Sequence, residues 1–206
     1  MKRPLVILSL VVLCIFALNG CSVILGGSDP KDLYILTSQS CTPATDAVSK
    51  PYSLLVRNIQ ASKLFDSQKI VFSRDEQTRG YYQYASWAES PAHQLTNILF
   101  ARIECEKIFE KVTRGFEPSS TDFSLSIEIL DFRHDAVQSP GEAVVSMRAE
   151  LYDLRSRILL ASKIFEHRTS ASEFTAKGAV TGFNQDVQKI YDEMVAWLRE
   201  SATPFG

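Results

Sequence analysis

The chain has 206 residues, with 22 basic and 24 acidic side chains. Hydrophobic residues make up 45% and aromatic residues 10%, which is more than a disordered chain carries, and the absence of a long run of like charges argues against nucleic acid as a partner. Without residues 1–20 the chain has 20 basic and 24 acidic side chains, so the remaining 186 residues suit one mildly acidic folded domain.

Residues 1–20 are built like a bacterial secretion signal peptide. Lys2 and Arg3 supply a positive start, an apolar stretch interrupted only by Ser9 follows, and Gly20 is the small residue at the end. The apolar stretch of about 15 residues is shorter than the roughly 20 needed to cross a bilayer. A cleaved signal is therefore favoured over an uncleaved transmembrane anchor.

Cys21 follows this small residue, and the order resembles the lipobox of bacterial lipoproteins. In that class the chain is cut before the cysteine, and acyl chains such as palmitate are attached to the cysteine. We therefore expect a covalent lipid on Cys21 and no other cofactor. Ser22, in place of an aspartate that resembles an inner-membrane retention signal, predicts an outer-membrane anchor and a periplasm-facing protein. Residues 21–31, which contain Gly26–Pro30, are predicted to be a lipidated tether, and 32–206 the domain.

The remaining cysteines suit an oxidising compartment. Cys14 leaves with the signal and Cys21 is consumed by lipid, which leaves Cys41 and Cys105. They either form a disulfide, which persists in an oxidising space, or stay as two unpaired cysteines. Because there is no Cys-x-x-Cys and the three histidines are scattered, no metal site is predicted.

The first half of the domain combines short strands with one helix. Runs of apolar and β-forming residues predict strands at Leu33–Thr37, Tyr52–Ile59, Lys69–Phe72 and Gly80–Tyr84, with a polar loop at 38–50. Ser90 followed by Pro91 is typical of a helix start. Apolar residues from Leu95 to Ile103 recur at helical spacing, which predicts an amphipathic helix of about 15 residues.

The second half shows the clearest patterns. Apolar and polar residues alternate in 123–129 and 143–151, and 158–167 completes a third strand, so short turns between them predict an antiparallel meander. A final helix has an apolar stripe that includes Phe183 and Leu198. The predicted fold class is α+β, with a largely antiparallel sheet and two long amphipathic helices packed on one face.

No catalytic residue is predicted. His134 lies beside Asp131 and Asp135, which could suggest a general base, but a charged exit from a strand explains the same residues with fewer assumptions. His93 and His167 are expected at the surface. Serine-hydrolase, zinc-protease and nucleotide-binding motifs are missing from the sequence. The protein is therefore predicted not to be an enzyme.

The most aromatic stretch runs from Tyr81 to Trp87. Because tyrosine and tryptophan are enriched at interfaces, Tyr82, Tyr84 and Trp87 are candidate contacts with a partner. The alternative is that some of these rings pack under the first helix. Trp87 most favours this alternative, whereas Tyr82 is expected to be the exposed contact. Similarly, Phe174–Phe183 is either a helix start or an apolar edge used for docking.

In order, these segments resemble the ABC-type transport auxiliary lipoproteins over nearly the whole chain after the signal. The resemblance rests on the signal peptide with Cys21 after it and on six segments of the domain: Asp32–Leu36, Leu55–Ile59, Phe65–Arg74, Tyr82–Tyr84, Trp87–Pro91 and Asp186–Leu198. The segment at Trp87 is similar to the family's Trp-Ala-Glu-x-Pro entry to its first long helix. The pair Cys41 and Cys105 is not part of this resemblance.

The resemblance implies a non-enzymatic role beside other envelope proteins. Expected partners are an MCE-domain protein, the subunits of an inner-membrane ABC transporter and the membrane itself, with phospholipid as a further candidate. Docking on a ring-shaped MCE protein would suit a ring-like homo-oligomer. A generic envelope assembly or structural lipoprotein is the alternative, and a periplasmic hydrolase would need a catalytic arrangement that the sequence does not show.

Overall fold

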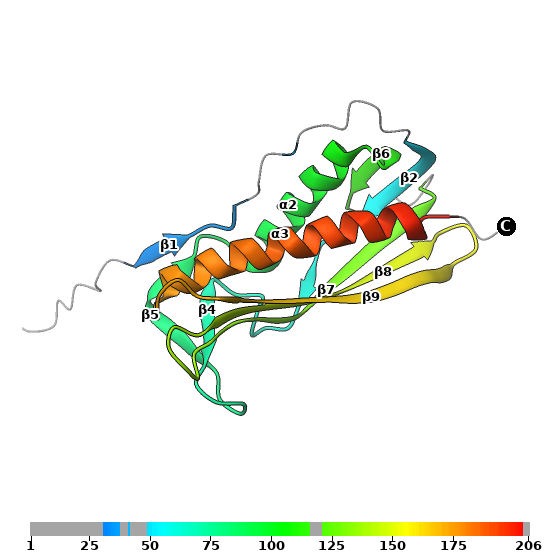
Figure 1. Ribbon diagram of the computed structural model, residues 1–206. Coiled ribbons are helices and arrows are strands. Elements are labelled where there is room, and N and C mark those ends of the chain that lie inside the picture. Colours follow the sequence, from blue (N-terminus) through cyan, green and yellow to red (C-terminus); the bar gives the residue numbers. More distant parts are fainter. Residues whose placement is uncertain (1–30, 38–40, 42–48, 116–120, 204–206) are drawn as a thin grey trace, which may run out of the picture. The chain divides into compact units, whose positions relative to one another are not determined.

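The computed structural model describes residues 31–37, 41, 49–115 and 121–203. The chain divides into residues 1–31 and 32–206, and the fold is that of the second unit. Its elements follow one another as β1 (Asp32–Tyr34), β2 (Lys50–Val56), β3 (Gln60–Ala61), β4 (Lys69–Ser73), β5 (Gly80–Trp87), α2 (Pro91–Glu106), β6 (Phe109–Arg114), β7 (Phe123–Asp135), β8 (Glu142–Asp153), β9 (Ile158–Ser170) and α3 (Ala176–Ser201). Figure 1 shows helices α2 and α3 on a strongly extended sheet, which confirms the α+β class.

The three longest strands form the predicted meander. β7 pairs antiparallel with β8 and β8 pairs antiparallel with β9. Residues such as Leu125, Ile127 and Met147 turn toward the helices and are buried, whereas Glu128 and Arg148 form an ion pair of 2.9 Å on the other face. The sheet is therefore apolar on one side and polar on the other, as expected for an antiparallel sheet covered on one face.

Shorter pairings make the sheet a mixed one. β7 pairs in parallel with β2, β3 and β4, and further parallel pairs join β2 to β6 and β1 to β5. Antiparallel pairing thus holds the long strands and the β4–β5 pair, and parallel pairing attaches the others. β6 has no clear strand pattern in the sequence and was not predicted, because only Phe109 of that strand is a buried apolar residue.

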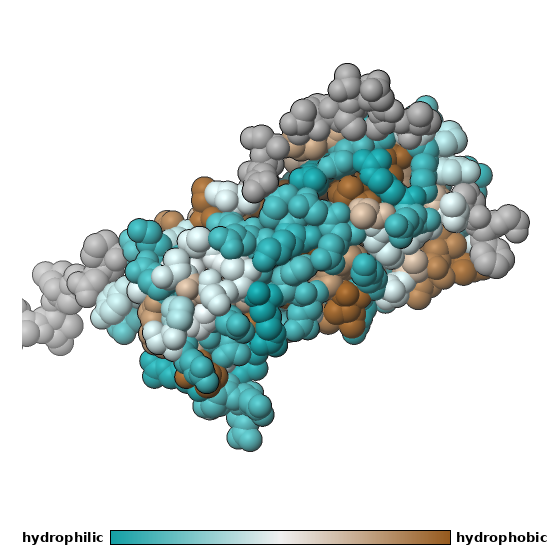
Figure 2. Space-filling model, in the orientation of Figure 1, coloured by the Kyte–Doolittle hydropathy of each residue, from teal (hydrophilic) through white to brown (hydrophobic). Residues whose placement is uncertain are grey.

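Both helices begin with a side-chain cap. The Ser90 hydroxyl accepts a hydrogen bond from the backbone N–H of His93, with Pro91 in the first turn of α2, and Thr175 caps α3 in the same way. The outward side of α3 is hydrophilic in Figure 2, and its opposite side buries the predicted stripe: Phe183, Val187, Ile190, Met194 and Leu198. The Tyr191 hydroxyl donates to the Leu95 carbonyl at 2.9 Å and ties the two helices together.

Candidate interaction site

The aromatic stretch predicted as a contact region forms an irregular part of β5. Lys69 of β4 pairs with Ser86, and Val71 pairs with Tyr81, so a step of two residues on β4 faces a step of five on β5. Extra residues on one strand leave the hydrogen-bonded ladder and redirect their side chains. Residues 82–84 therefore depart from the regular in-and-out alternation of the strand.

This bulge borders a groove of about 610 Å³ between β5, β1 and the start of α3, three elements that lie at the same end of the sheet in Figure 1. Four aromatic side chains line it: Tyr34, Tyr82, Tyr84 and Phe174. Tyr84 is 54% exposed and Phe174 is 48% exposed, so both rings are available to a partner. The charged side chains in the lining are Asp32, Glu173 and Lys177. The groove thus offers aromatic contact area with little net charge.

The Tyr82 hydroxyl is held by a hydrogen bond to the buried His134. The Tyr82 hydroxyl lies 2.7 Å from Nδ1 of His134, and Nε2 of His134 lies 3.0 Å from the Pro140 carbonyl oxygen. Because a carbonyl only accepts hydrogen bonds, Nε2 carries the proton and Nδ1 accepts from Tyr82. Burial raises the pKa of the Tyr82 hydroxyl, which therefore keeps the proton that it donates. The Phe174 ring meets His134 edge-on at 5.8 Å.

His134 is buried, whereas the sequence predicted that it lies at a charged, exposed end of a strand. A bulge in β7 causes the difference. Pairing with β8 shifts register between Ile129 and Asp131, so the inward residues change from odd to even numbers. Phe132 and His134 consequently turn inward and are buried. A catalytic role for His134 has no support in this geometry, because both ring nitrogens are already committed.

Acidification is expected to destabilise the protein through His134. Burial lowers its pKa below the ordinary 6.5, so the unfolded chain binds a proton at pH values where the folded protein does not. The stability contributed above pH 6.5 is therefore lost as the pH falls through the lowered pKa. In urea titrations, His134→Gln should be less stable than the wild type by about 1–3 kcal/mol near pH 8, and this gap should shrink toward about pH 5.

The exposed His93, which pairs with Glu89 at 2.6 Å, provides the matched control. His93→Gln should change the unfolding free energy by less than about 0.5 kcal/mol at any pH. A gap between wild type and His134→Gln that stays constant with pH would contradict the assignment.

The structure separates the candidate contact residues. Tyr84 is exposed in the groove, whereas Tyr82, predicted as the exposed contact, is half-buried because its hydroxyl is held by His134. Trp87 is only 1% exposed, because its ring packs 5.8 Å from both Phe132 and Phe183. Its place among the partner contacts is therefore corrected: Trp87 is a core residue. Phe174 also lines the groove. It belongs to the segment Phe174–Phe183, for which the sequence allowed either a helix start or a docking edge. In the structure α3 begins at Ala176, so Phe174 precedes the helix.

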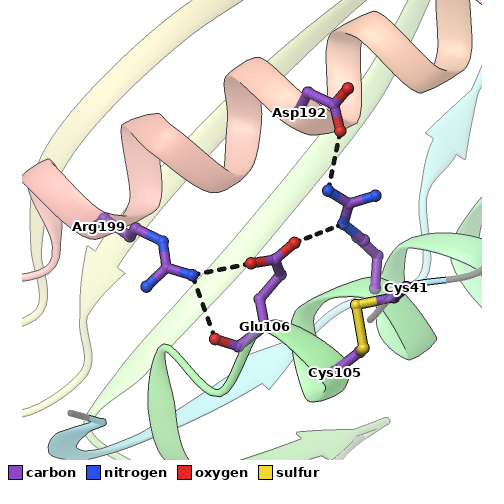
Figure 3. Close-up of a disulfide and its surroundings, with 6 residues drawn as sticks. Cys41, Cys105, Glu106, Asp192 and Arg199 are labelled. Atoms are coloured by element: carbon purple, nitrogen blue, oxygen red, sulfur yellow. Dashed lines mark hydrogen bonds and ion pairs between the residues drawn. A yellow bond between two sulfur atoms is a disulfide. The ribbon is translucent and has the colours of Figure 1, made fainter. Parts of the chain in front are cut away.

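Cys41 and Cys105 are joined by a disulfide at the end of α2. Figure 3 shows an ion-pair cluster beside it, in which the Glu106 carboxylate accepts from Arg102 and Arg199 at 2.8 Å each. Arg102 also reaches Asp192 of α3 at 2.9 Å. These contacts join the C-terminal end of α2 to the C-terminal half of α3.

The remaining histidine of the sheet, His167, does not line the groove. His167 pairs with Glu193 at 2.7 Å, at the sheet-facing edge of α3. No set of three or more metal-ligating side chains comes together in residues 31–37, 41, 49–115 and 121–203. None of the helices in that part of the chain is long and apolar enough to span a bilayer. Cys21 and the signal at 1–20 lie outside the described residues.

Comparison with known proteins places this fold. The crystal structure of protein XCC0632 from Xanthomonas campestris is 22% identical, covers 82% of this chain and 95% of its own length, and superposes with a TM-score of 0.74. Hypothetical protein CT253 from Chlamydia trachomatis is 10% identical, covers 74% of this chain and 98% of its own, and has a TM-score of 0.51. At these identities the similarity shows the fold alone.

Sequence comparison is more specific. A search of curated proteins finds no match. The family model described as the ABC-type transport auxiliary lipoprotein component, however, matches residues 34–195, which covers the helices and strands of the described residues except the start of β1 and the end of α3. The chain therefore belongs to the ABC-type transport auxiliary lipoprotein family.

Proposed function

We propose that this protein is a non-enzymatic lipoprotein of an MCE and ABC-type transport system that moves phospholipid between the inner and outer membranes. The family makes it an envelope-associated auxiliary component of a transporter. The finer assignment adds an acylated Cys21, an outer-membrane anchor, a periplasm-facing domain and an MCE-domain partner. The observation that carries it is the order of the chain: a lipobox-like Cys21 followed closely by the family domain at 34–195.

The geometry supports a role in binding rather than in catalysis. His134 is closed off by Tyr82 and Pro140, whereas Tyr84 and Phe174 present open rings at a groove. Aromatic side chains that can be desolvated on one face are frequent energetic centres of protein interfaces. We assign this groove as the surface that meets the transport partner.

Crosslinking in cells followed by gentle detergent purification of the full-length protein tests the proposal. Mass spectrometry should identify an MCE-domain protein together with ABC transporter subunits in the purified material, and co-purified phospholipid would add a direct lipid role. Recovery of other envelope proteins without an MCE partner would contradict the proposal and favour a general assembly or structural lipoprotein.

Truncating the two exposed rings of the groove should weaken this association. The combined Tyr84→Ala and Phe174→Ala variant is expected to lose about 2 kcal/mol of binding free energy, which is about 30-fold in Kd, because both rings would lose their desolvated contact. Quantitative mass spectrometry of the crosslinked partner measures the loss. The loss should occur with the fold intact, since both side chains are about half exposed.

Tyr81 provides the matched control for this variant. It lies on the same strand and is 43% exposed, but it does not line the groove. Tyr81→Ala should leave partner recovery unchanged. Equal losses for Tyr81→Ala and for the groove variant would show that the groove has no special role.

A further inference from the structure

Residues 32–37, termed the strap, hold two apolar side chains out to solvent. Leu33 is 68% exposed and Ile35 is 60% exposed, the highest fractions among the large hydrophobic side chains in the described part of the chain. The alternate residues turn inward: Tyr34 packs against the core and Leu36 is buried. The strap is therefore amphipathic, with one face in the protein and an apolar face outside it.

The strap is fixed in place along its whole length. β1 pairs in parallel with β5, after which the Leu36 N–H donates to the side-chain oxygen of Gln94 at 2.7 Å. The Thr37 N–H donates to the side-chain oxygen of Asn184 at 2.9 Å. Because these bonds set the backbone, Leu33 and Ile35 cannot turn inward without breaking them. Their exposure is built into the fold.

The tether limits how far this apolar face can be from a membrane. Residues 22–31 are the only ones between Cys21 and Asp32, so a fully extended backbone bridges at most about 40 Å. A strand of 13 residues such as β7 is itself about 43 Å long, so the tether does not hold the far end of the sheet equally close. A covalent anchor at this distance gives the strap a high effective concentration at the bilayer, and a weak contact suffices.

The charges near the strap do not supply the attraction. Lys31 and Lys177 are exposed, and so are Asp32 and Glu173. Lys189, which lines a pocket with Thr37, pairs with Asp186 at 3.9 Å, so these charges leave no net charge to draw the strap to anionic lipid. The remaining driving force is the burial of apolar surface, which salt does not screen.

We propose that Leu33 and Ile35 contact the phospholipid bilayer that holds the acyl chains of Cys21. The contact orients the domain with its β1 end toward the membrane, and it rests on the lipid anchor in the proposed function but not on the transporter. A membrane-facing β1 end also brings the aromatic groove near the lipid surface.

An environment-sensitive fluorophore on an introduced cysteine tests the contact. Full-length acylated protein carrying Leu33→Cys is labelled and reconstituted in vesicles of phosphatidylethanolamine and phosphatidylglycerol; Cys41 and Cys105 are consumed in their disulfide. We expect a blue-shifted emission and a loss of intensity when a quencher is attached to the lipid, both persisting at high salt. Adding Ile35→Ser should reduce both effects.

The matched control is Leu159→Cys, at a leucine that is 45% exposed on β9, which should show neither effect. Equal quenching at the two positions, or none at Leu33, would overturn the contact. Protection of the Leu33 label in detergent that grows with protein concentration would assign the face to a second copy and also overturn it. Intact mass separates the two proposals: missing acyl chains would overturn the anchor and the contact together, whereas an unquenched label on acylated protein would overturn the contact alone.

Discussion

Replacing Trp87 with alanine is expected to lower the unfolding free energy by about 3–5 kcal/mol. The indole is 1% exposed and lies 5.8 Å from the Phe132 ring of the sheet and from the Phe183 ring of α3. Those two rings stack on each other at 4.5 Å. Removal of the indole therefore opens a cavity where β5, β7 and α3 meet, and the neighbouring aromatic rings cannot close it without losing their own contacts.

Chemical denaturation followed by far-UV circular dichroism measures this loss. Trp87→Phe should recover much of the stability, because a smaller aromatic ring fills part of the space, and Tyr84→Ala should cost little because that ring is half exposed. A Trp87→Ala protein as stable as the Tyr84→Ala protein would show that the indole is not central to the core.

Replacing both Cys41 and Cys105 with serine is expected to have an effect of similar size. The disulfide links residues that are 64 apart in the sequence. In the chain-entropy model, closing a loop of that length raises the free energy of the unfolded chain, and so stabilises the folded protein, by about 4 kcal/mol. For a domain of this size such a loss corresponds to a melting temperature lower by about 8–16 °C. The double variant avoids a leftover reactive thiol.

Thermal unfolding of the wild type in the presence of a reductant gives the matched comparison. The reduced wild type and the double serine variant should melt together, below the oxidised wild type. The ion pairs Arg102–Asp192 and Glu106–Arg199 also join the two helices, so the folded structure should persist at room temperature. A double variant that melts with the oxidised protein would show that those contacts alone hold this region.

Much of the fold follows from patterns within single segments. The alternation in residues 123–129 and 143–151 predicts two strands of the meander, and Ser90 with Pro91 predicts the first turn of α2. These features are local: strand alternation and helix caps depend on neighbours a few residues away. The match of the family model over 34–195 likewise agrees with the resemblance found in the sequence.

Pairing between distant segments set the rest. The sequence did not show β6, whose strand character depends on parallel pairing with β2, and it left the Cys41–Cys105 pair open. Lys50 is a further example, because its ammonium donates to the Arg199 and Ala202 carbonyls at 2.7 and 2.8 Å, at the end of α3. A lysine within a strand gives no sign of a helix end about 150 residues later.

The candidate site shows the same division. The sequence by itself determined which residues are aromatic between Tyr81 and Trp87, and it placed the tyrosines on a strand from Gly80 to Tyr84. Only the tertiary structure decided that Trp87 is core, that Tyr84 is open and that Tyr82 rests on His134, because bulges in β5 and β7 shift the alternation. A bulge arises where two strands pair with unequal numbers of residues, so its position is a property of the pair and cannot be read from either strand alone.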